Sequence, residues 1–445
     1  MPKERNPAPA GNAFTHGASL RAAWLAGKQH PAEPTAPAQH GPDVPDHPDE
    51  PRAPDASRPE TPQQPEAPQR PAVPLATAQV ADNLDLVGKI YQESVFPSVL
   101  SVARSERLDS PLVVDLDPTT VCDLACPECI SADVLHHGQL SKDRIVELAE
   151  ELTRTGVRAV ILIGGGEPLL HRAIGTVIET LHGAGIRIGL VTNGTQIHRH
   201  IDRLAGMLSW VRVSVDAGTE ETYPKFRPSR GGRSMFPLVV GNMRLLAERK
   251  AGRLGYSFLL MQRFGKDGTV EASNYDEVYT AGRLAKETGC DYFELKAMLD
   301  QDHYTVNQDE QYVDRVNEQW ERLKELEDDS FHLLRSSNWE AVRHGADPYQ
   351  PKEYATCAVA ELRTTVTPTG VYVCPYHRGN PKGRIGDIRE TSFAELWRQA
   401  DTTVIDPRKD CRFQCARHAT NTAIGDLAEP RNRPHTLVPD FDPFI

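Results

Sequence analysis

Short apolar runs rich in β-branched residues alternate with longer amphipathic segments between Leu112 and about Asp300. The runs have the length of buried strands, and the segments between them have the apolar spacing of helices. Strands that alternate with helices form parallel sheets through right-handed crossovers. We therefore predict an α/β fold in which a parallel sheet curls into a partial (β/α)6 barrel. The six predicted strands cover residues 112–116, 158–163, 186–191, 210–215, 256–261 and 292–296.

The helices expected between these strands include residues 141–154, 173–184, 236–249 and 275–288. Beyond the barrel, the pattern predicts a long charged helix over 307–327 and a second helical segment near Trp339. Two short β-branched runs flank Pro368, Thr369 and Gly370, which predicts a β-hairpin over 362–374. A short helix is expected over 392–399, and the last 30 residues, rich in Pro, Asn and Asp, are expected to be irregular.

Composition changes the picture at the N-terminus, because 17 of the 35 prolines fall in the first 74 residues. A segment so poor in periodic apolar residues cannot bury enough surface to offset the entropy of ordering it. We therefore expect the chain to be organised as a disordered tail, a barrel, a helical connector and a small hairpin-plus-helix domain. These parts cover residues 1–78, 79–303, 304–345 and 346–445, respectively.

Charge and hydropathy exclude two classes of partner. Lys and Arg total 50 against 62 Asp and Glu, a net charge of −12, with no concentrated basic stretch, which argues against nucleic acid. No apolar run reaches the length of a membrane span, and the N-terminus lacks the apolar stretch of a secretory signal. We expect a cytoplasmic protein without a membrane partner. In that reducing compartment, its eight cysteines are more often ligands or nucleophiles than disulfides.

Three cysteines, Cys122, Cys126 and Cys129, lie within eight residues directly after the first predicted strand. Three thiolates can converge on one soft metal centre, and on a four-iron cluster they leave one iron open for a non-protein ligand. A zinc site completed by His136 or His137 is the alternative.

The second predicted strand ends in Gly164, Gly165, Gly166, Glu167 and Pro168. Glycines let the backbone approach a ligand closely, and strand-end carbonyls with Glu167 suit an ammonium group. A glycine run is often only a turn. This one lies at the carboxyl end of a parallel strand, where α/β barrels build their sites, which favours a binding role.

Together these elements resemble the radical S-adenosylmethionine (SAM) family over about residues 110–300. The resemblance implies that the three cysteines bind a [4Fe-4S] cluster whose open iron is chelated by the amino and carboxylate groups of SAM. It also implies that the glycine run with Glu167 and Pro168 receives the SAM amino group. Glu128 departs from the family pattern, because many members carry an aromatic residue there, near the adenine. The further SAM contacts implied by the resemblance are Thr192, Asn193, Ser214 and Asp216.

Strand alternation supports the ribose-binding part of this assignment independently. The three valines of residues 211–215 would face the helices, while Arg212, Ser214 and Asp216 would face the barrel interior. Buried polar groups need partners, which a ribose supplies, and an internal polar network is the alternative. Arg227 in the following loop is a candidate partner for the SAM carboxylate, and a solvated arginine is an equal alternative.

Four C-terminal cysteines resemble the shortened SPASM-like domain called twitch, which holds an auxiliary cluster. Four thiolates can ligate every corner of a second [4Fe-4S] cluster, and a structural zinc has the same ligand count. A cluster without an open iron suits electron transfer and favours a net oxidation. His377 and His418 lie beside these cysteines and either tune the cluster or simply pack. The four cysteines are Cys357, Cys374, Cys411 and Cys415.

The sixth predicted strand offers a candidate base. Glu294 and Lys296 share its inward face, and oxidation of an alcohol after hydrogen-atom abstraction needs a group that takes the hydroxyl proton. An internal salt bridge is the alternative for this pair. Cys290 starts the same strand at the barrel bottom, which favours packing over hydrogen-atom donation. His303 and Tyr304 follow in the next loop as positional candidates for substrate contact.

The resemblance to twitch-type dehydrogenases implies an oxidoreductase that converts an alcohol of a sugar, cyclitol or aminoglycoside to a ketone in antibiotic biosynthesis. A 5'-deoxyadenosyl radical would abstract hydrogen from this small-molecule substrate, and an external donor such as flavodoxin or ferredoxin would supply the electron. The alternative is epimerisation or cross-linking of a ribosomally made peptide. A metal-binding scaffold without SAM turnover would leave Glu167 and the strand-end polar residues unexplained.

Overall fold

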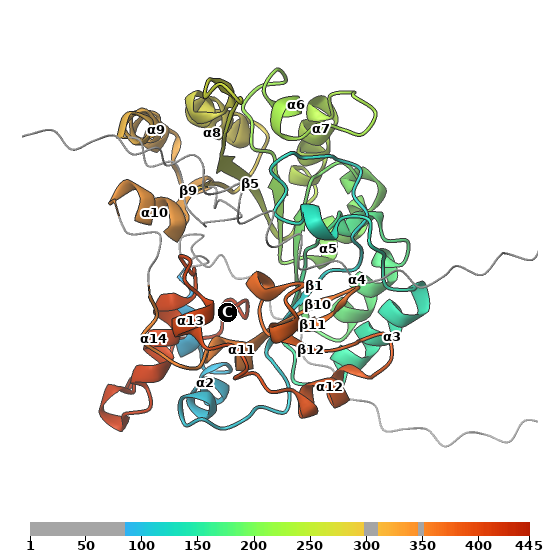
Figure 1. Ribbon diagram of the computed structural model, residues 1–445. Helices are drawn as coiled ribbons and strands as arrows, with labels where there is room; N and C mark the ends of the chain where they lie inside the picture. The colour runs from blue at the N-terminus through green and yellow to red at the C-terminus, as the bar shows by residue number, and fades with distance from the viewer. Residues whose placement is uncertain (1–84, 298–309, 346–350) are drawn as a thin grey trace, which may run out of the picture. The chain divides into compact units, whose positions relative to one another are not determined.

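The computed structural model describes residues 85–297, 310–345 and 351–445 (Figure 1). The expected disordered tail over residues 1–78 and the substrate-contact candidates His303 and Tyr304 lie outside the described residues. In the part of the chain that is described, no helix is both long enough and apolar enough to cross a membrane.

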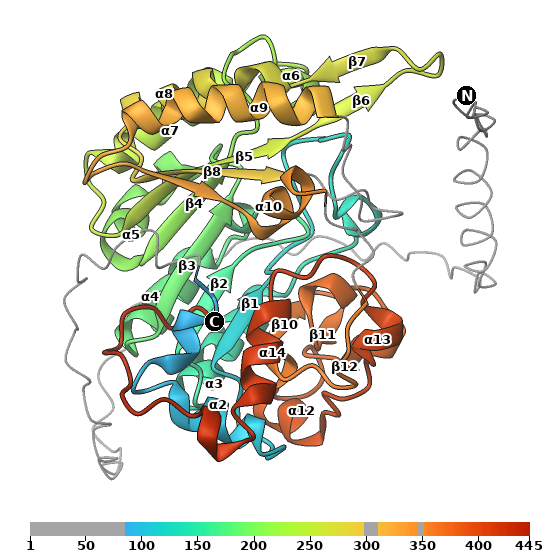
Figure 2. The ribbon, with the colours of Figure 1, turned by 90° about the vertical axis from the view of Figure 1, so that its left-hand side faces the viewer.

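Six neighbouring parallel strands form the barrel, in the order in which they occur along the chain (Figure 2). Each predicted strand has an observed counterpart, and the helices between them pack on the outer face. The predicted α/β partial barrel is therefore confirmed. The strands are β1 (Val113–Leu116), β2 (Ala159–Leu162), β3 (Arg187–Thr192), β4 (Trp210–Ser214), β5 (Arg253–Leu260) and β8 (Tyr292–Ala297).

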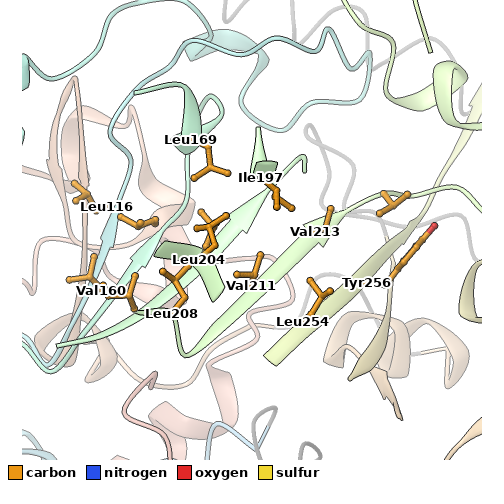
Figure 3. Packing of buried hydrophobic residues seen from close by; sticks show 14 of the residues in the cluster. Leu116, Val160, Leu169, Ile197, Leu204, Leu208, Val211, Val213, Leu254 and Tyr256 are labelled. Carbon is orange, nitrogen blue, oxygen red and sulfur yellow. The ribbon is translucent and has the colours of Figure 1, made fainter. Parts of the chain in front are cut away.

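The barrel helices bury their apolar faces against the outer face of the sheet. Alternate strand residues such as Val160, Val211 and Val213 meet helix residues such as Leu204 in one apolar core (Figure 3). The Ser141 hydroxyl accepts a hydrogen bond from Arg144 N (3.1 Å), which caps the first of these helices. The helices are α3 (Lys142–Thr153), α4 (Ile174–Gly183), α5 (Ile201–Met207), α6 (Tyr223–Phe226), α7 (Phe236–Ala247) and α8 (Val278–Glu287).

The sheet is longer at both edges than predicted, with ten strands among the described residues. Strand β9 (His332–Arg335) pairs in parallel with β8, within the segment predicted to be a helical connector. Helices α9 (Glu310–Leu323) and α10 (Ser337–Arg343) confirm the helical parts of that segment. The strand escaped prediction because it is four residues long and its His and Arg break the apolar pattern.

At the other edge, β10 (Arg363–Thr367) pairs in parallel with β1, so the C-terminal strands continue the barrel sheet. β11 (Gly370–Tyr372) is antiparallel to β10 with Thr367 opposite Gly370, which confirms the predicted hairpin. Gly370 has a φ of +144°, a conformation that favours glycine. A third strand, β12 (Arg384–Gly386), was not predicted.

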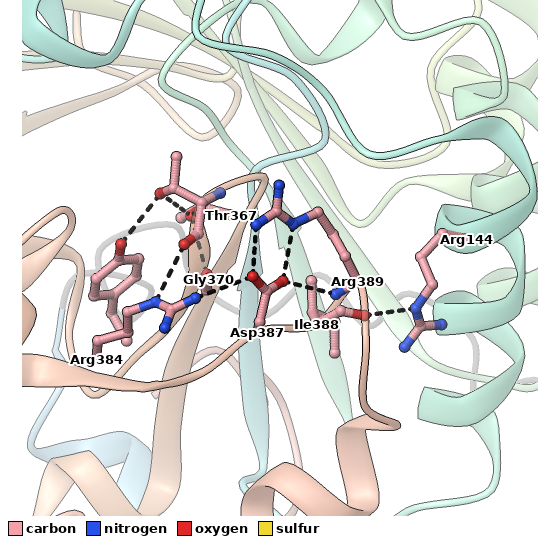
Figure 4. Close-up of polar contacts among 9 residues, drawn as sticks. Arg144, Thr367, Gly370, Arg384, Asp387, Ile388 and Arg389 are labelled. Atoms are coloured by element: carbon pink, nitrogen blue, oxygen red, sulfur yellow. Dashed lines mark hydrogen bonds and ion pairs between the residues drawn. The ribbon is translucent and has the colours of Figure 1, made fainter. Parts of the chain in front are cut away.

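A polar network fixes this hairpin to the barrel (Figure 4). Asp387, after β12, accepts hydrogen bonds from Arg389 Nε (2.9 Å) and Arg384 Nη2 (3.1 Å). Arg144 of α3 donates from Nε to the Ile388 carbonyl (2.6 Å). The C-terminal region is therefore tied to the barrel by side chains as well as by strand pairing.

A second hairpin, β6 (Gln262–Phe264) and β7 (Val270–Ser273), lies between β5 and α8 and forms its own two-stranded sheet. Figure 2 shows it reaching past the end of α9. Phe264 and Val270 pair across its strands, and their exposed fractions are 50% and 46%. The sequence analysis missed this hairpin, although the glycines at 265 and 268 are a turn signal.

The bottom of the barrel is closed by both ends of the described chain. Helix α2 (Phe96–Ala103) and the last two residues, Phe444 and Ile445, pack against the inner face of β1 and β2. Helix α14 (His418–Asp426) joins this cluster through Ile424, so the expectation that the last 30 residues are irregular was wrong over residues 418–426. Thr, Asn and Gly hid this helix because they are weak helix formers. The remaining helices are α11 (Val359–Leu362), α12 (Phe393–Gln399), which confirms the prediction over 392–399, and α13 (Pro407–Asp410).

Candidate active site

The three-cysteine loop lies at the carboxyl ends of the parallel strands. It follows β1, and its thiols, from Cys122, Cys126 and Cys129, are half-buried. Asp123 anchors the loop to the end of β3. Its carboxylate accepts hydrogen bonds from Asn193 Nδ2 (2.8 Å), Thr195 Oγ1 (2.6 Å) and Gln196 Nε2 (2.8 Å). The sequence analysis missed this anchor, although an acid between two clustered cysteines was visible.

Asn193 also reaches the cysteines directly, because its Nδ2 lies 3.8 Å from Cys122 Sγ. On the opposite side, the backbone N of Ala125 donates to the Pro228 carbonyl (2.8 Å) in the loop after β4. Burial raises the pKa of the Cys122 thiol to about 12 and also raises that of Cys126. Isolated thiolates are therefore disfavoured in this loop, and a bound metal would stabilise them.

Glu128, the position that departs from the radical SAM pattern, pairs with Arg263 of β6. Its Oε1 lies 2.7 Å from Arg263 Nη1, and the Glu128 side chain is 10% exposed. Burial raises the pKa of this carboxyl, which Arg263 opposes. Glu128 therefore joins the cysteine loop to the β6–β7 hairpin.

Glu167 lies next to the cysteine loop and is 2% exposed. Its carboxylate accepts hydrogen bonds from Leu169 N (3.1 Å), Thr192 Oγ1 (2.7 Å) and Asn193 N (2.7 Å). Burial raises its pKa to about 7 in spite of these bonds. Thr192, Asn193 and Glu167, which were predicted as separate contacts, therefore form one network.

The glycines before Glu167 are explained by close backbone approach. A Cβ on Gly166 would lie 2.2 Å from the Val121 carbonyl oxygen, and one on Gly164 would lie 2.9 Å from Asp117 Oδ1. Gly166 N and Glu167 N donate to carbonyls of the segment that leads into the cysteine loop. The run therefore packs the second strand end directly against this loop, and Pro168 begins the short turn that follows.

Asp117, which the sequence analysis missed, lies fully buried beside the glycines. Its Oδ2 accepts a hydrogen bond from Gly165 N (2.6 Å), while its buried Oδ1 has no partner among the described residues. Burial raises its pKa to about 6. An acceptor with an unused lone pair at this edge fits an ammonium donor such as that of SAM. The available signal was an acid directly after the first strand.

The predicted ribose and carboxylate contacts are joined to one another. Arg227 donates from Nε to Asp216 Oδ2 (2.7 Å), and Asp216 Oδ1 accepts from Leu259 N (2.8 Å). Ser214 lies half-buried on the inward face, as alternation predicts. Arg227 is therefore held by a carboxylate of this chain and is not a solvated arginine, while its contact with the SAM carboxylate stays a prediction.

Glu294 and Lys296 form a charged group inside the barrel with Arg212. Arg212 Nη1 lies 3.2 Å from Glu294 Oε2, and Lys296 Nζ lies 3.7 Å from the same oxygen. Burial and the Arg212 charge lower the pKa of Lys296 to about 8. Burial raises the pKa of Glu294, but Arg212 and Lys296 outweigh it and hold this pKa below its usual range. Cys290, two residues before β8, is buried in the core between the sheet and the helices, as expected.

The four C-terminal cysteines line a single cavity of about 430 Å³, a volume that includes space open to solvent. Burial raises the pKa of Cys357 to about 11 and that of Cys411 to about 12. Folding therefore brings Cys357 and Cys415, which are 58 positions apart in the sequence, to the same cavity. The cavity is lined by Cys357, Cys374, Cys411 and Cys415 together with Lys352, Tyr354, His377 and Asn421.

Of the two histidines singled out beside these cysteines, His377 contacts one of them with its side chain and His418 does not. His377 Nε2 lies 3.4 Å from Cys411 Sγ, and not at its sequence neighbour Cys374. His418 Nδ1 lies 3.2 Å from the Tyr354 hydroxyl, and the two rings are stacked. Lys352, which the sequence analysis did not single out, donates from Nζ to the Phe413 carbonyl (3.1 Å).

Both thiol groups fit iron–sulfur clusters by their chemistry, because cysteine thiolates are the usual ligands of such clusters. Within the described ranges, no three or more His, Cys, Asp or Glu side chains are placed as a group that could hold a metal ion. Four cysteines are also the ligand set of structural zinc. Metal analysis distinguishes the two at the C-terminal cavity.

Arg378 connects the two thiol groups. It lies four residues after Cys374, and its Nη1 donates to the Ser131 hydroxyl (3.4 Å), two residues after Cys129. The Arg378 charge also lowers the pKa of Asp117, against the larger effect of burial. The C-terminal cavity is therefore linked to the mouth of the barrel by one short segment.

Comparisons with known proteins agree with this arrangement. Residues 116–262 match the model of the radical SAM superfamily. The chain is 25% identical to the mycofactocin maturase MftC of Mycobacterium tuberculosis over 313 residues, which are 67% of this chain and 73% of that protein. It is 28% identical to the AdoMet-dependent heme synthase of Methanosarcina barkeri over 186 residues, 41% of this chain and about half (49%) of that protein.

Among solved structures, the chain resembles that of Streptococcus suis SuiB bound to the precursor peptide SuiA. The TM-score is 0.50 at 14% identity, and the match covers 68% of each chain. At this identity the likeness supports the fold alone. The predicted resemblance to the radical SAM family is confirmed, whereas the twitch assignment and the sugar-alcohol substrate stay predictions.

Proposed function

We propose that this chain, whose residues 116–262 match the model of the radical SAM superfamily, is an oxidoreductase that modifies a peptide by radical chemistry. One observation carries the proposal. The three-cysteine loop, the buried Glu167 network and the unpartnered Asp117 oxygen meet at the carboxyl edge of one parallel sheet. Parallel α/β barrels bind their ligands at this edge.

When bound, a [4Fe-4S] cluster on the loop cysteines and SAM supply a 5'-deoxyadenosyl radical, which takes a hydrogen atom from a substrate carbon. Asp117 Oδ1 and the backbone near Gly165 would accept the SAM ammonium. Glu167 holds the ends of β2 and β3 together beneath that group. Asp123 orients the cysteine loop, and the Arg227–Asp216 pair borders the loop on its other side.

A peptide substrate has better support than the sugar, cyclitol or aminoglycoside of the main sequence-based interpretation. The similarity to the maturase extends over two thirds of the chain, and SuiB, which shares the fold, was solved with a precursor peptide bound. Side chains at the mouth of the barrel also suit a peptide. Lys225, Arg230 and Arg233 are exposed there without a carboxylate partner among the described residues. With the exposed Phe264 and Val270, they complement an extended chain that carries acidic and apolar residues.

The C-terminal cavity supports net oxidation. Four cysteines that ligate every iron of a second cluster leave no open position, so the site suits electron acceptance. The substrate would lose one hydrogen atom to the 5'-deoxyadenosyl radical, then one electron to this site and one proton to a base. Lys296, inward-facing at the end of β8 with a pKa of about 8, is the proposed base. An external donor of the flavodoxin or ferredoxin class would supply the electron for SAM cleavage.

Metal analysis tests the assignment of two clusters. Iron, sulfide and zinc are measured in the anaerobically reconstituted protein and in a variant with Cys122, Cys126 and Cys129 all changed to alanine. We expect about eight irons per chain to fall to about four, with SAM perturbing the EPR signal that the variant lacks. Zinc in the remaining site would exclude electron acceptance there. Absence of SAM cleavage by the reduced wild type would overturn the function itself.

Deuterium transfer tests the substrate class. The reduced enzyme is incubated with SAM and either a perdeuterated peptide mixture or perdeuterated sugars and aminoglycosides. We expect 5'-deoxyadenosine to gain deuterium from the peptides and none from the sugars, as read by mass spectrometry. Transfer from the sugars alone would restore the sugar-alcohol oxidation in place of the peptide proposal.

A further inference from the structure

The four-cysteine cavity contains a buried ammonium group and an imidazole N–H donor, both directed at its thiol-bearing loop. We propose that Lys352 and His377 are positioning residues that stabilise the reduced, electron-rich form of the cluster in this cavity. This inference rests on the proposed function, because it assumes that the four thiols hold a second iron–sulfur cluster. It adds the residues that would make that cluster a ready electron acceptor.

Lys352 is buried although it carries a charge. Its residue exposure is 3%, and its Nζ donates to the Phe413 carbonyl (3.1 Å). Phe413 lies midway between Cys411 and Cys415, so the ammonium is anchored at the centre of that loop. Burial lowers the pKa of Lys352, and Cys415 and Cys411 act against this effect. Burying a lysine is costly, and an anionic group in the cavity offsets that cost.

Hydrogen bonds determine the tautomer of His377. Asn380 Oδ1 accepts from Lys382 N (3.0 Å), which turns the Asn380 amide nitrogen toward His377 Nδ1 at 3.2 Å. An amide nitrogen only donates, so Nδ1 is the acceptor and the ring proton lies on Nε2. That Nε2–H then donates to Cys411 Sγ at 3.4 Å. Asn380 therefore orients His377 as a donor to a ligand thiolate.

The Lys352 ammonium and the His377 N–H donor both stabilise negative charge at the site. Four thiolates outweigh the positive charge of a four-iron core, so the site is anionic and becomes more so when it accepts an electron. A nearby ammonium and an N–H···S hydrogen bond stabilise the more negative state more strongly. The reduction potential therefore rises, which favours removal of an electron from the substrate radical.

The test is an EPR-monitored redox titration in the background in which the three loop cysteines are alanine, so that the signal comes from the second site alone. The variants are Lys352→Met, Lys352→Arg and His377→Phe. The control is Lys382→Met, since Lys382 forms a half-exposed surface pair with Asp410 (2.5 Å). Iron content is measured for each protein before titration.

We expect the ratio of reduced to oxidised cluster at a fixed potential to fall about tenfold in Lys352→Met, a shift of about 59 mV for one electron. His377→Phe should shift the midpoint the same way by less, while Lys352→Arg and Lys382→Met should leave it unchanged. Four irons with unchanged midpoints in Lys352→Met and His377→Phe would overturn the inference and leave the proposed function standing. If Lys352→Met loses iron, the midpoint potentials of His377→Phe and Lys352→Arg still test the inference. A background protein without iron would instead contradict the proposed second cluster.

Discussion

The two cysteine groups are built in opposite ways. Cys122, Cys126 and Cys129 lie within eight residues of one loop, and charged groups of the barrel mouth surround them. The four C-terminal thiols come from segments up to 58 positions apart and line one cavity. The first group is therefore assembled by the local chain and leaves room for an exogenous ligand. The second is assembled by folding, which brings its four thiols to the wall of one cavity.

The number and arrangement of the thiols therefore suit the two sites to different functions. A cluster held by three thiolates would leave an iron open for a small molecule, whereas a cluster held by four would suit storage or transfer of an electron. The surrounding groups agree with this division. Next to the loop, Asp117 Oδ1 is an acceptor without a partner in the part of the chain that the structure describes, and the cavity has donors in Lys352 and His377. Acceptors suit the ammonium of SAM, and donors suit thiolates.

Removing one thiol from each site tests whether the two sites have separate functions, and it should have the largest effect. Cys126→Ala should abolish SAM cleavage, because two thiolates cannot hold a cluster that needs three. Cys374→Ala should retain most SAM cleavage but lose oxidised product, because the electron acceptor is lost. 5'-Deoxyadenosine and product are quantified by liquid chromatography with mass spectrometry. Loss of SAM cleavage to the same extent in both variants would show that the two sites are not functionally separate.

Glu167→Gln should have the next largest effect. The Glu167 carboxylate accepts three hydrogen bonds that join β2 and β3 beneath the proposed SAM ammonium. An amide keeps the shape but removes the charge, and we expect SAM cleavage to fall roughly 100-fold, or about 2.7 kcal/mol. Isothermal titration of SAM and the rate of 5'-deoxyadenosine formation measure this effect.

Glu277 provides a matched control for Glu167. Its carboxylate also accepts three hydrogen bonds, each 2.7 Å long. The donors are Gly218 N, Thr219 Oγ1 and Thr222 Oγ1, which lie in the loop after β4. Glu277→Gln should lower thermal stability as Glu167→Gln does, yet leave SAM binding within about twofold. Equal losses of SAM binding in the two variants would mean that Glu167 acts by stabilising the fold and has no special role at the site.

Much of the three-cysteine site could be predicted from the sequence, and little of the four-cysteine cavity could be. Cys122 to Cys129, Gly164 to Glu167 and the end of β3 are local features at strand ends, and alternation along β4 correctly assigned Arg212 to the interior. Asp216 lies beyond the end of β4 with a φ of +56°, so strand alternation does not explain its position. Asp117 and Asp123 were missed because a single acid in a loop has no periodic signal. Lys352 was missed because its role depends on Phe413, 61 positions away. The joining of β10 to β1 is likewise a long-range pairing that no local pattern encodes.

A smaller effect is expected at Lys296, near the carboxyl end of β8. If its neutral amine takes the substrate proton, oxidised product per 5'-deoxyadenosine should rise with pH through about 8, where the amine loses its proton, and level off above. Lys296→Gln should remove this pH dependence and lower the ratio about tenfold at pH 9, while SAM cleavage continues. Product ratios measured from pH 6 to 9 test this. A rise that persists in the variant would assign the proton to another group.

The smallest effect should come from Cys290→Ala, which completes the comparison with a cysteine that belongs to neither site. Cys290 is 4% exposed within the helix-side core, and burial raises the pKa of its thiol. Removing one sulfur from a packed core should cost about 1 kcal/mol and lower Tm by about 2 °C. Iron content and product formation should stay at wild-type values, measured beside Cys374→Ala, which should lose about half of the iron. Loss of product in Cys290→Ala with full iron content would instead identify Cys290 as a hydrogen-atom donor, and a redox-neutral epimerisation would then replace oxidation as the reaction.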